Sequence, residues 1–181
     1  MSEKREIIRS IAVLTLICIV ISGALAVVNS FTAPVSQVNA AVREDEARRQ
    51  LIPDAAEFLL IEDADLPAQI VSVYAALDAA GENAGYVFTV NGSGFGGTIS
   101  VLCAIGADGN ILSCQALDVS SETKTLGGKV ANTEYSNQYT GADADLSGID
   151  AISGATITSD AYRGCVQAAF EAYAQIQEAA E

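Results

Sequence analysis

The chain has 181 residues, of which 9 are Lys or Arg and 23 are Asp or Glu, giving a formal net charge of -14 and no histidine. So acidic a protein lacks the basic side chains that neutralise nucleic-acid phosphates, and we expect no nucleic-acid partner. The absence of histidine excludes Ser-His-Asp and Cys-His catalysis, and it excludes histidine-ligated zinc or haem.

The first predicted element is a membrane anchor at residues 11–28. This run is uncharged and apolar apart from two hydroxyl residues and a glycine. As a helix it would extend roughly 27 Å, which nearly matches the hydrocarbon core of a bilayer. Three basic residues precede the run, and the next one after it is Arg43. The positive-inside rule therefore predicts that residues 1–10 are cytoplasmic and that the chain crosses the plasma (inner) membrane once, with its domain outside. A cleavable signal peptide is the alternative, because Ala24-Leu25-Ala26 has the form of a cleavage site.

Residues 36–181 are predicted to form one extracytoplasmic domain behind a linker at residues 29–35. About 150 residues suffice for a single hydrophobic core. The segment 36–50 is polar and rich in Ala, with charges at helical spacing, and it predicts a surface helix that Pro53 ends.

Several short strands should follow this helix. We expect them within residues 55–65, and over 70–77, 86–90 and 98–105, from their β-branched and aromatic content. Residues 91–97 contain four glycines, but they lack the lysine and the following helix of a phosphate-binding loop. We therefore interpret 91–97 as a bend between two strands.

Asp108-Gly109 is the strongest hairpin signal in the chain and predicts an antiparallel sheet. A two-residue loop at this pair would place Ala107 opposite Asn110, and Cys103 opposite Cys114. Either a cross-strand disulfide or two buried thiols would fit that position. No Cys-x-x-Cys pair occurs, so neither an iron-sulfur cluster nor a metal site is expected.

A last helix is predicted over residues 159–177, after a polar loop at 120–129 and an irregular segment at 131–150. Apolar residues recur on one stripe of this helix, as core packing requires. The fold class that follows is α+β, with an N-terminal transmembrane helix and one mixed domain containing an antiparallel sheet and a C-terminal helix.

A turn of small and hydroxyl residues precedes the last helix. Gly154 and Ala155 leave room for a bulky group near the backbone. Four hydroxyls surround them, from Ser153, Thr156, Thr158 and Ser159. The N-H groups at a helix start favour a phosphate, but the same hydroxyls could simply cap the helix, and we assign that capping to Thr158 and Ser159.

The run from Asp150 to Thr156 resembles the flavinylation motif of the FMN-binding domain family, in which an acidic residue, two free positions, Ser or Thr, Gly, Ala and a final Thr or Ser mark the attachment point. The resemblance implies a phosphoester between FMN and Thr156. With the anchor, the glycine-rich bend and the hairpin, the chain resembles the G subunit of the Rnf electron-transport complex, which is related to the C subunit of the sodium-translocating NADH:quinone reductase.

The polar loop supports the same resemblance. The family pattern His-x-Glu-Thr-Pro-Gly-Leu-Gly is matched at four positions, and it is not matched at Ser120, Lys124 or Thr125. The resemblance therefore implies flavin contacts from the four matching residues and from the turn: Glu122, Thr123, Leu126, Gly127, Ser153, Gly154, Ala155, Thr156, Thr158 and Ser159.

By this resemblance the chain is a covalently flavinylated electron carrier without independent catalytic activity. Its partners would be the other membrane and iron-sulfur subunits of an ion-translocating ferredoxin:NAD oxidoreductase, with a flavin transferase acting during maturation. Two alternatives remain open. One is a stand-alone extracytoplasmic flavoprotein serving a surface reductase, and the other is an anchored interaction domain whose turn is only a helix cap.

Overall fold

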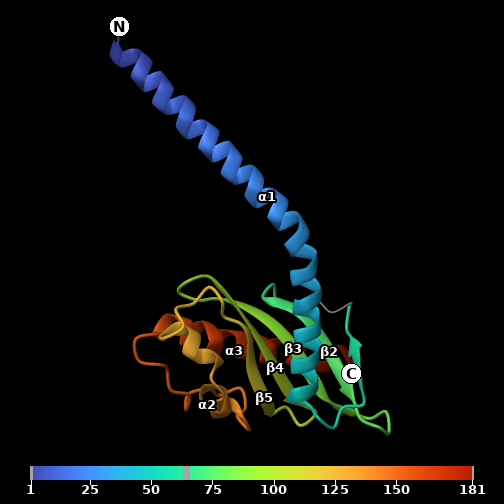
Figure 1. The fold of residues 1–181 in the computed structure, drawn as a ribbon. Helices are drawn as coiled ribbons and strands as arrows, with labels where there is room; N and C mark the ends of the chain where they lie inside the picture. Colours follow the sequence, from blue (N-terminus) through green and yellow to red (C-terminus); the bar gives the residue numbers. More distant parts are fainter. Residues whose placement is uncertain (1, 63–65, 181) are drawn as a thin grey trace. The chain divides into compact units, whose positions relative to one another are not determined.

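The structure, a computed structural model, describes residues 2–62 and 66–180 (Figure 1). Its elements in chain order are α1 (Ser2–Leu51), β1 (Glu57–Leu60), β2 (Ile70–Leu77), β3 (Asn83–Ser93), β4 (Thr98–Gly106), β5 (Ile111–Asp118), the 3-10 helix η1 (Gly127–Ala131), α2 (Thr133–Ser136), the 3-10 helix η2 (Asn137–Tyr139) and α3 (Thr156–Ala180). The antiparallel sheet with a C-terminal helix confirms the predicted fold class.

The chain divides into two compact units, Met1–Arg43 and Glu44–Glu181. The first unit lies within α1, and its large apolar side chains are exposed. Of the helices in residues 2–62 and 66–180, α1 alone is long and apolar enough to cross a membrane. Residues 29–35, predicted as a linker, are helical, and Pro34 lies inside α1. The division into an anchor and an outer domain stays a prediction.

The second unit is built on a five-stranded sheet in the order β1-β2-β3-β4-β5, with every neighbouring pair antiparallel. Residues 94–97 form the predicted bend, closed by the Gly94 N-H donating to the Gly97 carbonyl at 2.8 Å, whereas residues 91–93, predicted as part of the bend, continue β3. Each strand pairs with the next one along the chain, which is the topology of a β-meander.

Both faces of the sheet are covered. Alternate residues of a strand point to opposite faces. In β4, Cys103 faces the core that includes α3, whereas its neighbours Leu102 and Ala104 pack with Ala47 and Leu51 of α1. Burial on both faces explains why β4 is apolar along nearly its whole length.

Residues 36–50 are helical as predicted, but the end of this segment is not a surface helix. The Arg48 side chain is buried, and its guanidinium carbon lies 3.5 Å from the centroid of the Tyr74 ring. The Glu44 carboxylate accepts hydrogen bonds from the hydroxyls of Ser72, at 3.3 Å, and Thr89, at 2.8 Å. Polar residues that looked solvent-facing in the sequence are thus paired on the sheet.

The hairpin confirms the predicted opposition of Cys103 and Cys114, but by a different turn. Gly106 donates its N-H to the Asn110 carbonyl at 2.9 Å, so the loop has three residues and contains Gly109 with φ 83°. A register shift at Ala104 and Ile105 compensates for the longer loop. The two thiols are free, with the Cys114 Sγ donating to the Cys103 Sγ at 3.2 Å.

Part of the segment predicted to be irregular, residues 131–150, forms α2 and η2. These short helices carry Tyr135 and Tyr139. The Tyr135 ring packs edge-on against Tyr162 of α3, with centroids 5.4 Å apart, and the Tyr139 ring packs against it at a tilt, with centroids 5.2 Å apart. The three buried rings fix the segment against α3.

Candidate functional site

The last helix begins at Thr156, three residues before its predicted start. Gly154 has φ 79°, a left-handed conformation that suits glycine, and the Ala155 N-H donates to the Ile152 carbonyl at 2.9 Å. The Ser159 N-H then makes the first helical hydrogen bond, to the Ala155 carbonyl at 3.0 Å. Thr156 is therefore the first residue of α3, and its exposed side chain stands at the N-terminus.

The predicted capping role of Thr158 and Ser159 is wrong, because both lie inside the first turn. Both side chains are buried. The Ser159 Oγ accepts the N-H of Ile152 at 3.0 Å, from the segment that precedes the helix. The Thr158 hydroxyl donates to the Glu122 Oε2 at 3.0 Å. Both hydroxyls hold other segments onto α3 instead of capping its N-terminus.

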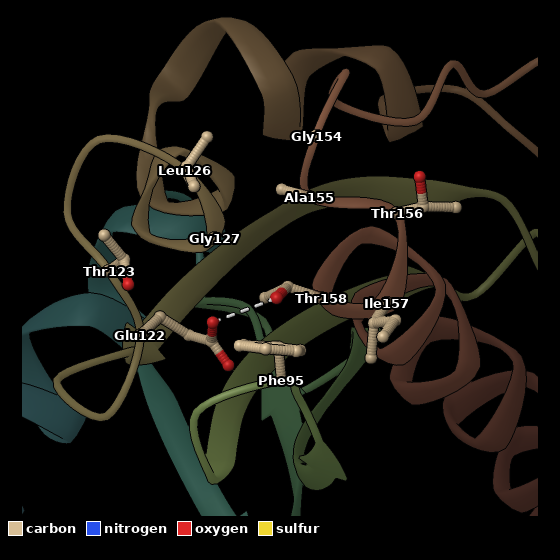
Figure 2. A pocket seen from close by; sticks show the side chains of 10 residues that line it. All are labelled: Phe95, Glu122, Thr123, Leu126, Gly127, Gly154, Ala155, Thr156, Ile157 and Thr158. Carbon is tan, nitrogen blue, oxygen red and sulfur yellow. Dashed lines mark hydrogen bonds between the residues drawn. The ribbon is translucent and has the colours of Figure 1, made fainter.

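A cavity of ≈ 440 Å³ lies beside this helix start. Its walls come from the bend after β3, the loop before η1 and the turn into α3 (Figure 2). The lining residues are Phe95, Glu122, Thr123, Leu126, Gly127, Gly154, Ala155, Thr156, Ile157 and Thr158. The volume lies within the range of about 300 to 1,000 Å³ that small-molecule and cofactor sites occupy.

The Glu122 carboxylate connects the three walls of this cavity. Its Oε1 accepts the N-H of Gly96 in the bend at 2.8 Å, and its Oε2 accepts the Thr158 hydroxyl. Only 7% of the residue's surface is exposed. Figure 2 shows the Glu122 and Thr158 side chains directed toward one another between Phe95 and Gly127. The carboxylate is the acceptor in both bonds, as an ionised acid requires.

Three glycines make room for this carboxylate. A Cβ added at Gly94 would meet Oε1 of Glu122, and one added at Gly127 would meet Oε2 and the Thr158 hydroxyl. A Cβ at Gly96 would meet the Ser121 carbonyl. The glycines of the bend and the loop thus permit the close approach of two segments around one buried acid.

The structure brings eight of the ten predicted site residues into the lining of one cavity, and it leaves out Ser153 and Ser159. The sequence reasoning missed two lining residues, Phe95 and Ile157, which are 76% and 56% exposed. A large aromatic residue between glycines in a predicted bend was a signal for Phe95. Nothing in the sequence distinguished Ile157 from a core residue.

The cavity lining is apolar and hydroxyl-rich, with Glu122 as its only charged residue among those the structure describes. No cluster of residues suited to bind a metal occurs in the described part of the chain. The first N-H groups of α3 have no helical acceptor and carry partial positive charge at the Thr156 edge. The site therefore combines an apolar space, an anion-favouring helix start and one buried acid.

Comparisons with known proteins agree with this arrangement. The FMN-binding domain family matches residues 94–171. The chain is 29% identical to the G subunit of an ion-translocating oxidoreductase complex of Methanosarcina acetivorans, over 98% of this chain and 100% of that protein. It is also 29% identical to the G subunit of the Na(+)-translocating ferredoxin:NAD(+) oxidoreductase complex of Acetobacterium woodii, over 92% and 91% of the two chains.

The fold is similar to that of a solved structure, the C subunit of the Na(+)-translocating NADH-quinone reductase from Parabacteroides distasonis. The TM-score is 0.54 at 21% sequence identity, covering 72% of this chain and 82% of the other. The family match begins at the glycine bend and extends into α3, so it spans all three walls of the cavity. The chain is thus a homologue of the G subunits of Rnf-type ion-translocating oxidoreductase complexes and contains an FMN-binding domain.

Proposed function

We propose that the chain is the flavin-carrying electron-transfer subunit of an Rnf-type ion-translocating ferredoxin:NAD oxidoreductase complex, with FMN attached by a phosphoester to Thr156. The names of its relatives and the FMN-binding domain support the electron-transfer role. The position of Thr156 supports the attachment.

The observation that carries the attachment is that an exposed threonine is the first residue of α3 and borders the cavity. A phosphate on its hydroxyl would lie beside the unpaired N-H groups of the first turn, where the helix dipole stabilises negative charge. The neighbouring hydroxyls of Thr158 and Ser159 are buried and engaged. Of these three hydroxyls, Thr156 alone is open to a modifying enzyme.

The size and lining of the cavity support placing the rest of FMN there. Its volume suits a cofactor, and Phe95, Leu126 and Ile157 provide apolar surface for a flat aromatic ring. The φ of Gly154 turns the chain sharply before Thr156, and its missing side chain leaves space beside Leu126, whose Cδ2 lies 3.5 Å from where a Cβ would stand.

In attachment, the Thr156 Oγ1 would form the phosphoester bond while the pyrophosphate bond of FAD breaks, with AMP leaving and the hydroxyl proton released. A separate flavin transferase would supply the catalytic groups. FMN, when bound, supplies reversible electron uptake, whereas the chain positions it and excludes water with the apolar lining.

We also propose that residues 11–28 of α1 cross the membrane, with the cytoplasmic end at residues 1–10. The exposed apolar side chains of α1 and its length support a span. Basic residues precede the apolar run, which supports placing the flavin domain on the outer face of the membrane. A covalent bond there would prevent loss of FMN to bulk solvent.

The attachment is tested by expressing the full chain with a flavin transferase, denaturing it and recording flavin fluorescence on the protein band. We expect a fluorescent wild type, whose mass increases by one FMN less one water. Thr156→Ala should be dark, and Ser147→Ala, which removes an exposed hydroxyl outside the attachment motif, should stay fluorescent. A fluorescent Thr156→Ala protein would refute the site, and a dark wild type would favour the interaction-domain alternative.

A further inference from the structure

We infer that Glu122 is a positioning residue that holds the cavity together and that its negative charge lowers the redox potential of the flavin. The first part concerns the protein without cofactor, and the second rests on the proposed function. Nothing in the loop's own sequence requires a buried acid, because a solvated loop would present Glu122 to water.

The positioning role follows from the two bonds of the carboxylate. They join Glu122 to residues 26 and 36 positions away along the chain, in the bend and in the first turn of α3. Glu122 is the side chain that bonds to both other walls, and glycines enclose it. Ser121 also ties the loop to the Thr98 carbonyl at 2.9 Å, but it does not reach α3. Loss of the side chain would release the bend from the helix start and leave the Gly96 N-H without its acceptor.

The electrostatic role follows from burial and from the lining. A charge that is 7% exposed is screened far less than a surface charge. The described lining offers no cation to neutralise it. An electron added to a flavin in this cavity brings negative charge near the carboxylate, and the repulsion disfavours the reduced form. A low-potential carrier would be the result.

The two roles can be separated because Thr158 can reverse its hydrogen bond. In Glu122→Gln, the amide oxygen can accept the Gly96 N-H while the amide nitrogen donates to the Thr158 hydroxyl, which accepts as well as donates. This variant removes the charge and keeps both links. Thr158→Val does the opposite, since it removes one link and keeps the charge.

The first experiment uses the full chain in detergent without flavin and measures hydrogen exchange of the Gly96 amide. We expect Glu122→Ala to accelerate exchange at least tenfold and Glu122→Gln to leave it within threefold of wild type. Equal exchange in wild type and Glu122→Ala would overturn the positioning role, and this result does not depend on flavin.

The second experiment measures the midpoint potential of the flavinylated chain by spectroelectrochemical titration. Glu122→Gln should shift the midpoint potential in the positive direction by at least about 30 mV. For a two-electron couple, this shift corresponds to a tenfold change in the oxidised-to-reduced ratio at a fixed potential. Asp160→Asn is the matched control, because it removes an equal charge near the N-terminus of α3, from a side chain that is 59% exposed. We expect its shift to be less than half as large.

The outcomes distinguish this inference from the proposed function. A fluorescent protein whose potential is unchanged by Glu122→Gln, or changed equally by Asp160→Asn, refutes the electrostatic role and leaves the attachment intact. A wild type that acquires no flavin refutes the attachment and the electrostatic role together, while the exchange experiment still decides the positioning role.

Discussion

The hydroxyl of Thr158 donates a hydrogen bond to the Oε2 of Glu122 at 3.0 Å, and both residues are buried. This contact joins the polar loop to the first turn of α3. Any atom that displaces Glu122 or Thr158 should therefore destabilise the fold. Gly127 lies against both side chains and has no side chain of its own to displace them.

Gly127→Ala should destabilise the fold by about 1 to 3 kcal/mol, because the new Cβ would collide with both partners of this hydrogen bond. Urea unfolding of the full chain in detergent measures the effect. Gly164→Ala is the control, since a Cβ there meets nothing within 4 Å inside α3. It should stabilise the helix by about 0.5 to 1 kcal/mol, and equal losses in the two variants would contradict the steric account.

Ser159→Ala should cost about 1 to 3 kcal/mol, because it leaves the N-H of Ile152 without its acceptor. The folded protein should still take up flavin, since Ser159 lies outside the cavity lining. Unfolding and gel fluorescence of the same preparation check both statements. Ser153→Ala, at an exposed position, should change stability by no more than about 0.5 kcal/mol.

Arg48→Ala should destabilise the unit Glu44–Glu181 by about 2 to 4 kcal/mol, because the buried guanidinium stacks on Tyr74. Arg49→Ala provides a control in the same turn. Its guanidinium is exposed and pairs with Asp45 at 3.0 Å, an interaction worth no more than about 0.5 kcal/mol. If thermal unfolding shows similar losses for both variants, the stacking contributes nothing measurable.

Stability should fall in alkaline solution. Burial raises the pKa of the Cys165 thiol to about 12, from an ordinary value of 9.0. The thiol therefore stays neutral in the fold while it ionises in the unfolded chain, so the associated stability is complete below pH 9 and is lost as the pH rises toward 12. This group contributes a slope of about 1.4 kcal/mol per pH unit.

Urea unfolding between about pH 8 and 11 measures this slope. Cys165→Ala should show a shallower decline than wild type, although a cavity lowers its stability at neutral pH. Some decline should persist, because burial also raises the pKa values of Cys114 and Tyr162. A slope unaffected by the substitution would show that Cys165 does not titrate in this range.

Thiol titration of the unfolded chain should give four thiols both with and without reductant, because the four cysteines are free. The Cys103 and Cys114 side chains face one another across β4 and β5 and are buried, so a reagent should reach them only after unfolding. Two fewer thiols without reductant would establish a disulfide between them.

Local patterns in the sequence determined the elements of this protein. The apolar run at residues 11–28 predicted a helix there, the strand at Ile70–Leu77 was predicted at its observed bounds, and Asp108-Gly109 predicted the hairpin that opposes Cys103 and Cys114. These signals reside in residues close together along the chain, where side-chain periodicity and turn chemistry act directly.

Only the tertiary structure decided what these elements do together. The burial of Glu122 and the place of Phe95 at the cavity depend on contacts between segments 26 or more residues apart, which no local pattern encodes. The helix begins at Thr156 and not, as predicted from the sequence, at Ser159. The hydroxyls of Ser159 and Thr158, which looked like caps, instead bond to Ile152 and Glu122. Distant hydrogen bonds compete with capping for the same groups, and burial determines which interaction forms.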